Sequence, residues 1–456
     1  MPNEAPDEFS VESVYAELLG RAPENKMEPR LAPLFRAMDI LGEPNKAFPI
    51  IHVTGTNGKT STARMIEAGL RAHGLSTGRY TSPHLSKVTE RISIDGAPVP
   101  DETFVRIWDE IRPYLQIVDG ELEAAGEPRL TYFECLTILG FAVFADQPVN
   151  VAVIEVGLGG ITDATNVGDG QVSVVTPISL DHTDLLGDTT EDIAYEKAGI
   201  IKPGGFLVSA AQPVDAAQVL LEKAKEVDVP FRFEGVEFGV ESRTVAVGGQ
   251  MVTIQGIAGR YEELLVPLHG AHQAENAAVA IAALEAFFGA EKPLDAEVLQ
   301  EAFATVTSPG RLEVVRTAPT IIVDAAHNPE GIRVSAEAIH EAFSFTKLAV
   351  VVGVLKDKDA EEILRQLKES LGDLAADYCF TQSNSPRAVP AEDLAEIAVD
   401  LGFGEDNIHV ADKLDDALEW AVERAETNED LAGGVLVTGS ITLVAEARIL
   451  LGKAEA

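Results

Sequence analysis

One stretch of ten residues, His52-Val-Thr-Gly-Thr-Asn-Gly-Lys-Thr-Ser61, constrains the fold of this chain more than any other feature. The apolar run 49–54 predicts a buried strand that enters it. The apolar-periodic segment Thr60–His73 predicts a helix that leaves it, with Gly74 at the helix C-cap. A glycine-containing turn between strand and helix points backbone N–H groups and the helix dipole at an anion. The pattern therefore predicts a phosphate-binding loop at the end of a buried strand.

The alternative interpretation of this stretch is a turn that binds no ligand. The presence of Lys59 makes that alternative the weaker one. In a phosphate-binding loop such a lysine bridges the β- and γ-phosphates of ATP, and Thr60 coordinates Mg²⁺ through its hydroxyl. The spacing departs from G-x-x-x-x-G-K-[ST], because Val53 stands five residues before Gly58 and the first glycine is Gly55. The predicted nucleotide-binding residues of the loop are Thr56, Asn57, Gly58, Lys59, Thr60 and Ser61.

The chain is strongly acidic. Its 74 Asp and Glu against 35 Lys and Arg give a formal net charge of -39 over 456 residues. This charge repels nucleic acid and anionic membrane surfaces, so neither is an expected partner. An anionic substrate must then be met by a few local cations, backbone N–H groups or metal ions. The two cysteines have no metal-type spacing, and the acidic N-terminus and short apolar runs predict a cytoplasmic protein without a membrane span.

Strands and helices alternate along the rest of the chain, which predicts a mostly parallel sheet covered on both faces. Further β-branched runs predict strands at 149–156, 171–177, 206–209, 320–324, 348–352, 377–381 and 435–438. Residues 231–269 predict a small antiparallel insert, and the acidic residues 1–9 a frayed tail. We expect an ATP-binding P-loop domain over 1–308 and a smaller Rossmann-like α/β domain over 309–456.

Polar residues follow three of the predicted strands. Ser82-Pro-His-Leu85 offers a hydroxyl and an imidazole to a phosphate, although Ser-Pro is also an ordinary turn signal. Glu155 ends an apolar strand, at the position where open α/β sheets bind ligands. A carboxylate on such an apolar strand needs a cationic partner, which favours Mg²⁺ binding over a role in a turn. His182, within Asp181-His-Thr-Asp184, is either a structural histidine or a metal ligand ordered by the adjacent acids.

The loop Thr54–Thr60 resembles the mononucleotide loop of the Mur ligase superfamily, which comprises the cell-wall UDP-muramyl amino-acid ligases and the folylpolyglutamate and dihydrofolate synthases. Segments 82–85, 155–166 and 181–187 resemble the S-P-H-L, E-V-G-L-G-G-x-x-D-A-T-N and D-H-x-x-x-L-G motifs of the folylpolyglutamate/dihydrofolate synthase family, in this order. The resemblance implies that Mg²⁺ is held beside the phosphates by Thr60, Ser82, Glu155 and His182.

The run 194–203 is also similar to this family. In the family, the lysine at the Lys197 position is often carbamylated, which turns a cation into a carboxylate-like metal ligand. From the residues alone, Glu196 and Lys197 form a solvated pair on a helix. Carbamylation of Lys197 is therefore implied by the resemblance only.

Two segments near the end of the first predicted domain resemble the H-Q-x-x-N and P-G-R motifs of the family. His272, Gln273 and Asn276 stand before an Ala-rich helix predicted at 276–288, as N-capping groups or as adenine contacts. Arg311, in the predicted linker, is suited to a bidentate phosphate contact. The resemblance implies that Asn276 and Arg311 bind the nucleotide.

Two later strand ends carry the remaining polar candidates. Residues 324–328, Asp-Ala-Ala-His-Asn, resemble the D-A-A-H-N-P motif, which implies nucleotide binding by Asp324 and a catalytic role for His327. Ser385 and Arg387 are assigned to glutamate, with an ordinary polar loop as the alternative.

The string Leu130-Thr-Tyr-Phe-Glu134 resembles the T-x-F-E segment of the family, in which the aromatic residue lies beside a pterin. The local alternative is a capping box between Thr131 and Glu134. The resemblance implies a folate site formed by Phe133, Gly159 and Asp163, since an aromatic wall suits a flat heterocycle. The loop begins at residue 52, which leaves little chain for the nucleotide-sugar domain of cell-wall ligases.

The expected activity is that of an ATP- and Mg²⁺-dependent ligase that joins L-glutamate to dihydropteroate or a reduced folate through an acyl phosphate. Lys59, Lys197 and His327 are its predicted catalytic residues, and the resemblance favours a monomer. A muramyl-type ligase, a nucleotide-dependent binding protein and a P-loop kinase are the alternatives. Polar groups at separate strand ends across two domains favour a site for three substrates over a kinase site.

Overall fold

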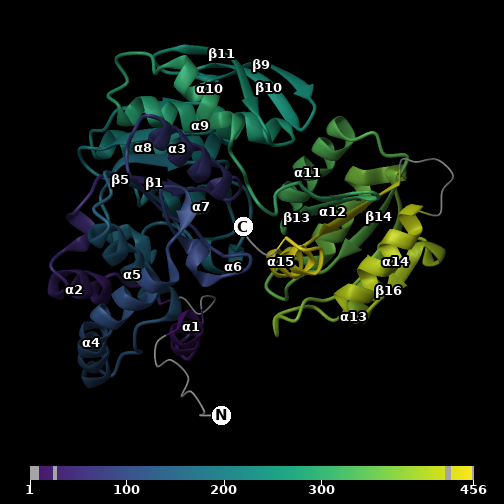
Figure 1. The fold of residues 1–456 in the computed structure, drawn as a ribbon, viewed down its shortest axis with the longest axis horizontal. Coiled ribbons are helices and arrows are strands. Elements are labelled where there is room, and N and C mark those ends of the chain that lie inside the picture. Colours follow the sequence, from purple (N-terminus) through teal and green to yellow (C-terminus); the bar gives the residue numbers. More distant parts are fainter. Residues whose placement is uncertain (1–9, 24–27, 427–432, 454–456) are drawn as a thin grey trace, which may run out of the picture. The chain divides into compact units, whose positions relative to one another are not determined.

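The computed structural model describes residues 10–23, 28–426 and 433–453 (Figure 1). The predicted tail at 1–9 lies outside the described residues. By its internal contacts the chain divides into one compact unit of Met1–Glu241, Thr253–Leu264 and Glu275–Thr305 and a second of Ser242–Val252, Leu265–Ala274 and Val306–Ala456. The domain boundary between 308 and 309 stays a prediction, because two pieces that precede it group with the second unit.

The first unit is built on an eight-stranded sheet, whose strand order places the phosphate loop at its centre. The strands lie in the order β4 (Ala97–Pro98), β3 (Ile92–Ile94), β2 (Thr77–Tyr80), β5 (Val151–Glu155), β1 (Ile50–Thr54), β6 (Gly170–Val175), β7 (Phe206–Ser209) and β8 (Phe231–Phe233). From β2 to β8 the neighbours pair in parallel, and β3 and β4 add an antiparallel edge. The segments that follow β1, β5 and β6 therefore meet at one edge of the sheet.

Helices cover both faces of this sheet, which explains why its central strands are apolar throughout. Successive strand residues point to opposite faces, and in β5 Ala152 and Ile154 join the apolar core that contains residues of α4 and α5, while α3 contacts β5 as well. The helices of this part of the chain are α1 (Val11–Leu19), α2 (Ala32–Ile40), α3 (Lys59–Ala72), α4 (Asp101–Ala125), α5 (Tyr132–Asp146), α6 (Thr183–Leu186), α7 (Thr190–Ala198), α8 (Val214–Glu226), α9 (Ala271–Phe287) and α10 (Ala296–Ala304).

A separate three-stranded sheet follows, in the order β11 (Arg260–Val266), β10 (Gly249–Gln255) and β9 (Gly239–Ala246). It occupies most of the range predicted as an insert, but the first residues of that range form β8, which pairs in parallel with β7. The reason is that an alternating Phe-Arg-Phe segment fits the edge of either sheet, and alternation alone does not say which strand it joins.

The second unit contains a six-stranded sheet in the order β12 (Glu313–Thr317), β13 (Thr320–Asp324), β17 (Gly433–Thr438), β14 (Lys347–Val352), β15 (Ala375–Phe380) and β16 (Ile408–Val410). Only the β12–β13 pair is antiparallel among these neighbours. In β14, Leu348, Val350 and Val352 share a core with residues of the helices on one face. The helices are α11 (Pro329–Ala342), α12 (Ala360–Leu371), α13 (Ala391–Asp400), α14 (Leu414–Glu426) and α15 (Ile441–Leu450).

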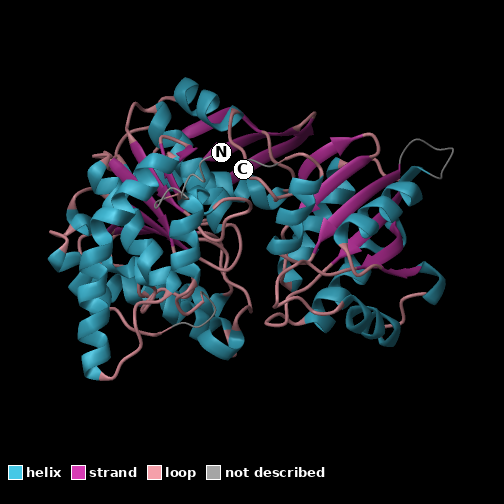
Figure 2. Cartoon of the chain, turned by 60° about the horizontal axis from the view of Figure 1, so that its bottom comes forward, coloured by secondary structure: helices cyan, strands magenta, loops and turns pink. Residues whose placement is uncertain are grey.

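This architecture confirms the predicted α/β fold class, with a phosphate-loop sheet followed by a smaller Rossmann-like sheet, and Figure 2 shows helices packed on the strands of each unit. One local prediction was wrong. The helix expected at 276–288 begins at Ala271, so His272, Gln273 and Asn276 lie inside α9 and do not cap it. These polar residues form the first turns of the helix and do not belong to the segment that precedes it. None of the described helices is long and apolar enough to cross a membrane.

Candidate active site

The loop between β1 and α3 approaches its neighbours so closely that two of its positions require glycine. Gly58 has φ 86°, and a Cβ there would lie 2.5 Å from Oδ1 of Asn276. Gly55 has φ 147°, and a Cβ there would lie 1.9 Å from Oγ1 of Thr176. Such a left-handed backbone is unfavourable for residues with a Cβ. The structure thus brings the predicted nucleotide-binding Asn276 directly against the loop.

The segment that follows β6 holds the loop in place. The Thr56 hydroxyl donates to the carbonyl oxygen of Ser179 at 3.0 Å and accepts from the Ser179 N–H at 3.1 Å. The Asn57 side chain donates to the Ser179 hydroxyl at 3.4 Å, and the Thr56 N–H donates to the carbonyl oxygen of Pro177. Sequence reasoning missed Ser179, and no local pattern marks it, because the contact exists only where β6 lies beside β1.

Two lysine ammonium groups meet at one carbonyl oxygen of this loop. Lys59 Nζ donates to the carbonyl oxygens of Gly55 at 3.0 Å and Thr56 at 3.2 Å, and Lys197 Nζ donates to the same Gly55 oxygen at 3.0 Å. Lys197 is only 3% exposed. Its burial and the charge of Lys59 lower the pKa of Lys197 to about 7. The interpretation of Lys197 as a solvated lysine is therefore wrong, since α7 turns it into the sheet edge.

Thr60 and Glu155 form the centre of the predicted metal set. The Thr60 hydroxyl donates to both carboxylate oxygens of Glu155, at 2.9 and 3.1 Å, and Glu155 is 1% exposed at the end of β5. Within the described ranges, no group of three or more His, Cys, Asp or Glu is placed to hold a metal ion. The donor set still fits Mg²⁺, because this ion commonly takes one or two carboxylates and completes its shell with water and substrate phosphate oxygens.

The other two predicted metal ligands lie in the segments that follow β2 and β6. Ser82 follows β2 and precedes a cis peptide bond to Pro83. His182 stands before α6 in a left-handed backbone conformation, with φ 51°, an uncommon geometry for a residue with a Cβ. Its N–H donates to the Asp181 carboxylate at 2.9 Å, and its ring Nε2 lies 3.9 Å from the same carboxylate. The Asp181 carboxylate thus lies beside both the backbone and the ring of His182, and the metal role of His182 stays a prediction.

His84, the histidine of the Ser-Pro-His-Leu segment, is held in a network of its own. Its Nδ1 accepts from Nε of Arg91 at 2.9 Å, and the ring packs edge-on against Tyr15. The carboxylate of Glu90 accepts from the N–H groups of Leu85, Ser86 and Lys87, which ties the same segment together. The segment is therefore an ordered loop.

The three residues predicted to bind folate gather around the backbone that follows Glu155. The Phe133 ring lies against Gly157, where a Cβ would be 2.5 Å from Cζ of the ring and 3.1 Å from Oδ2 of Asp163. Thr54 Oγ1 donates to the carbonyl oxygen of Gly159 at 2.8 Å, which joins this backbone to the phosphate loop. The predicted capping box of Thr131 and Glu134 is confirmed at the start of α5, and it coexists with the placement of Phe133 at the site.

Asp163 is already well supplied with hydrogen bonds. Its carboxylate accepts from the N–H of Leu158 at 3.0 Å and from the N–H of Thr165 at 3.0 Å, and also from the Thr165 hydroxyl. It is 2% exposed, and burial raises its pKa. Asp163 therefore orders the loop between Gly157 and Thr165, and its contact with a pterin stays a prediction.

In the second unit, Asp324 is the most heavily bonded of the predicted site residues. Its carboxylate accepts from the N–H groups of Leu312 and Ala326 and from the Ser335 hydroxyl, at 2.9, 3.1 and 2.8 Å. Asp324 thus fixes the backbone next to Arg311.

His327 and His272 belong to the same neighbourhood of the second unit. His327 Nδ1 lies 2.9 Å from the carbonyl oxygen of Ala325, so the ring donates a hydrogen bond there. Burial lowers the pKa of His272 to about 4. The negative charge of Asp324 acts to raise this pKa, and the positive charge of Arg311 lowers it further. His272 is therefore neutral near pH 7.

The pair assigned to glutamate lies in the loop that follows β15. The Arg387 N–H donates to the Ser385 hydroxyl at 3.3 Å, and the Arg387 guanidinium donates to Asp357 at 2.6 Å. The Arg387 side chain is 40% exposed. The structure thus brings Ser385 and Arg387 together, and the Arg387 guanidinium is half-exposed.

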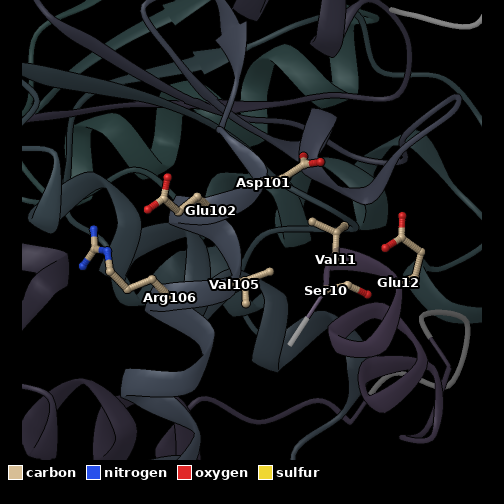
Figure 3. Close-up of a pocket in the computed structure, with 7 residues that line it drawn as sticks. All are labelled: Ser10, Val11, Glu12, Asp101, Glu102, Val105 and Arg106. Carbon is tan, nitrogen blue, oxygen red and sulfur yellow. The ribbon is translucent and has the colours of Figure 1, made fainter. Parts of the chain in front are cut away.

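A pocket lies apart from all these residues, where the first turns of α1 and α4 approach each other (Figure 3). Three carboxylates and one guanidinium contribute to its wall. Its lining residues are Ser10, Val11, Glu12, Asp101, Glu102, Val105 and Arg106. None of them belongs to a predicted site.

Comparisons with known proteins agree with this geometry. Residues 53–284 match the Mur ligase middle domain, and residues 310–441 match the Mur ligase glutamate ligase domain. The dihydrofolate synthase/folylpolyglutamate synthase of Mycobacterium tuberculosis is 43% identical over 453 residues, which cover 95% of this chain and 92% of that protein.

Solved structures are similar over almost the whole chain. Folylpolyglutamate synthase of Mycobacterium tuberculosis, complexed with ADP and AMPPCP, superimposes with a TM-score of 0.91 at 42% identity and covers 97% of this chain and 98% of its own. A complex of folylpolyglutamate synthase with AMPPCP and folate gives a TM-score of 0.83 at 31% identity, covering 97% and 100%.

Proposed function

Because the chain belongs to the dihydrofolate synthase/folylpolyglutamate synthase family of Mur ligases, we propose that it is an ATP-dependent ligase that joins L-glutamate to the carboxyl group of a folate-type acceptor. One observation carries the proposal. The phosphate loop with its two converging lysines adjoins the Thr60–Glu155 pair. The backbone after Glu155 continues to Asp163, and the Phe133 ring of α5 packs against Gly157 in that segment. A nucleotide site and an aromatic-walled acceptor site are thus neighbours in the first unit.

The acceptor carboxylate needs activation, because it is a poor acyl donor. We assign this step to transfer of the γ-phosphoryl group of ATP, which yields an acyl phosphate and ADP. The amine of L-glutamate then attacks the acyl carbon, the amide bond forms, and phosphate leaves. Lys59 neutralises charge that develops on the transferring oxygens, and the ordered loop holds the phosphates in line without reorganisation.

Mg²⁺ held by Thr60, Ser82, Glu155 and His182 would supply further charge neutralisation at the phosphates. We assign the other nucleotide contacts to Thr56, Asn57, Gly58, Ser61, Asn276, Arg311 and Asp324. His327 is proposed as catalytic, and Ser385 and Arg387 as glutamate-binding. The same proposal includes an ATP-binding domain over 1–308 and a glutamate-ligase domain over 309–456. It also includes a monomeric state, which light scattering of the purified protein tests.

Carbamylation of Lys197 is the finer part of the proposal. In this reaction the neutral ε-amine adds to the carbon of CO₂, a C–N bond forms, and a proton passes to solvent. Support comes from the lowered pKa of Lys197, about 7, which leaves much of the amine neutral near pH 7. With ¹³C-labelled bicarbonate, a carbamate carbon resonance is expected in the wild type and not in Lys197→Met. Equal spectra from both proteins would reject the modification.

The decisive experiment measures phosphate release with ATP, Mg²⁺ and L-glutamate, offering 7,8-dihydropteroate or tetrahydrofolate separately, with product masses read in parallel. Release with both acceptors defines a bifunctional enzyme, and release with one defines a dihydrofolate synthase or a polyglutamate synthase. A UDP-muramyl acceptor serves as the negative control for the cell-wall reaction. The folate proposal fails if neither folate acceptor supports glutamate-dependent release.

A further inference from the structure

Arg64 occupies a position on α3 that the proposed chemistry has not used. It follows Thr60 by four residues and precedes Glu67 by three, so the three side chains share one face of the helix. At one end of this face, Thr60 contacts Glu155 at the end of β5. At the other end, Glu67 pairs with Arg79 of β2 at 2.9 Å. Arg64 therefore lies between the nucleotide site and a buried ion pair.

The Arg64 guanidinium has no hydrogen bond or ion pair with any of the described residues, and its Nε is fully buried. Three carboxylates, Glu67, Glu90 and Glu155, act on its charge through space. Each of them has other partners: Arg79 for Glu67, three backbone N–H groups for Glu90, and the Thr60 hydroxyl for Glu155. The neighbouring carboxylates are thus committed elsewhere.

Arg64 is only partly exposed, and its guanidinium has no anionic partner at hydrogen-bond distance among the described residues. A charged group that has lost part of its hydration gains from such a partner. Burial and the neighbouring charge of Arg79 lower the pKa of Arg64 to about 9, so the guanidinium is still charged at neutral pH. In a chain with 35 basic residues against 74 acidic ones, an unpartnered cation at a substrate-facing edge indicates an anion that arrives from outside.

We propose that Arg64 binds an oxyanion at the ends of β5 and β2, and that this oxyanion is the carboxylate of the acceptor. The inference rests on the proposed function and deepens it. The phosphates of the nucleotide already face Lys59 and the start of α3. The acceptor carboxylate must lie between those phosphates and Phe133, whose ring packs against Gly157 just beyond Glu155 and against Tyr80 of β2. Arg64 lies on the β2 and β5 side of the loop, where that carboxylate enters.

A double-mutant cycle in the intact protein tests this assignment. The two changes are Arg64→Met and replacement of the acceptor carboxylate by a carboxamide, with tetrahydrofolate as the parent acceptor and Mg-ADP present. Loss of a charge-assisted hydrogen bond should weaken binding of the parent acceptor by about 10- to 100-fold. The carboxamide analogue should bind the wild type and the Met variant about equally, and Arg64→Lys should recover part of the affinity. Equal affinity of wild type and Arg64→Met for the parent acceptor would overturn the proposal.

Binding of ADP alone separates the two possible sources of the oxyanion. We expect Arg64→Met to leave ADP affinity unchanged. Loss of nucleotide affinity with intact acceptor binding would mean that Arg64 contacts a phosphoryl group, and the acceptor assignment would be wrong. Wild-type turnover, measured in parallel, tests the proposed function on its own, because these binding measurements do not depend on catalysis.

Thermal unfolding separates a binding role from a structural one, with Arg79→Met as the matched control. Arg79 is buried, forms an ion pair with Glu67 and donates to the Ser93 hydroxyl, so its loss removes the ion-pair partner of Glu67 and should lower Tm. Arg64 has no such partners among the described residues, so Arg64→Met should leave Tm unchanged or raise it. A fall in Tm as large as that of Arg79→Met would make Arg64 a structural residue and overturn the proposal.

Discussion

The strand ends of the two sheets carry polar residues at comparable positions, yet they use their charges differently. In the first unit, the ammonium groups of Lys59 and Lys197 converge on the carbonyl oxygen of Gly55. In the second unit, the carboxylate of Asp324 accepts three hydrogen bonds, and the guanidinium of Arg387 has a carboxylate partner in Asp357. At the phosphate loop two cations share one neutral acceptor, whereas Asp324 and Arg387 of the second unit have hydrogen-bond partners of their own.

This difference separates a binding edge from a scaffold edge. Two cations on one neutral oxygen repel each other, and the arrangement becomes favourable when an anion arrives. A carboxylate that accepts hydrogen bonds from three donors is already satisfied, and it holds the surrounding backbone in place. We therefore expect substitutions at the first edge to change activity and pH dependence, and substitutions at the second edge to change stability or a single substrate constant.

The largest effect is expected for Lys59→Ala. Removal of the cation that faces the transferring phosphoryl group should lower kcat by roughly 10²- to 10³-fold, as for the loss of one transition-state donor. Unfolding should change little, because Gly55 keeps its bond from Lys197. Steady-state phosphate release measures the effect, and Lys223→Ala, which removes a half-exposed lysine of α8 that pairs with Glu226, is the control. A near-normal kcat would refute the assignment of the loop.

Asp324→Ala should be the strongest destabilising change. It removes the acceptor for two backbone N–H groups and the Ser335 hydroxyl in a buried place, which should cost about 3 kcal/mol of unfolding free energy. Urea unfolding measures this, and Asp324→Asn, which keeps one acceptor oxygen, should cost less. Unchanged stability in the Ala variant would mean that the second edge is no scaffold.

With Lys197 kept unmodified in CO₂-free buffer, Lys197→Met should give a pH-dependent gain in stability on the order of 2 kcal/mol. In the folded protein the pKa of Lys197 is about 7, against 10.5 for an unperturbed lysine, so below pH 7 folding must bury a charge that the unfolded chain keeps in water. Between pH 7 and about 10.5 the unfolded state binds the additional proton, and wild-type stability rises with pH. The gain of the Met variant should therefore shrink over this range. Paired unfolding curves at several pH values test it, and a gain independent of pH would contradict the argument.

The smallest effect on folding is expected for Arg387→Ala. Its pair with Asp357 is half exposed, so the loss should amount to less than about 1 kcal/mol. If Arg387 binds glutamate as proposed, the KM for glutamate should rise by roughly 10-fold while the KM for ATP stays constant. An equal rise in both constants would remove Arg387 from the glutamate site.

Much of the site could be predicted because its residues stand in local patterns. The strand at Thr320–Asp324 has the bounds that were predicted, and the helix after the loop differs by one residue at each end. Asn276 was assigned to the nucleotide, and its side chain lies against Gly58. The start of α9 at Ala271, five residues before the predicted start at 276, was missed, because a polar run before an apolar segment looks the same outside a helix and in its first turns. Arg64 was also missed, although its spacing of four residues from Thr60 placed it on the same helix face.

The amino-acid sequence alone was sufficient for the strand–loop–helix unit, the alternation of strands and helices, and the resemblance to one ligase family. Each of these depends on residues that are close along the chain. The convergence of Lys59 and Lys197, the support of Thr56 by Ser179, and the missing partner of Arg64 emerged only from the folded chain. They depend on β5 and β6 lying on either side of β1, and it is this long-range packing that decides which charges are buried and which find partners.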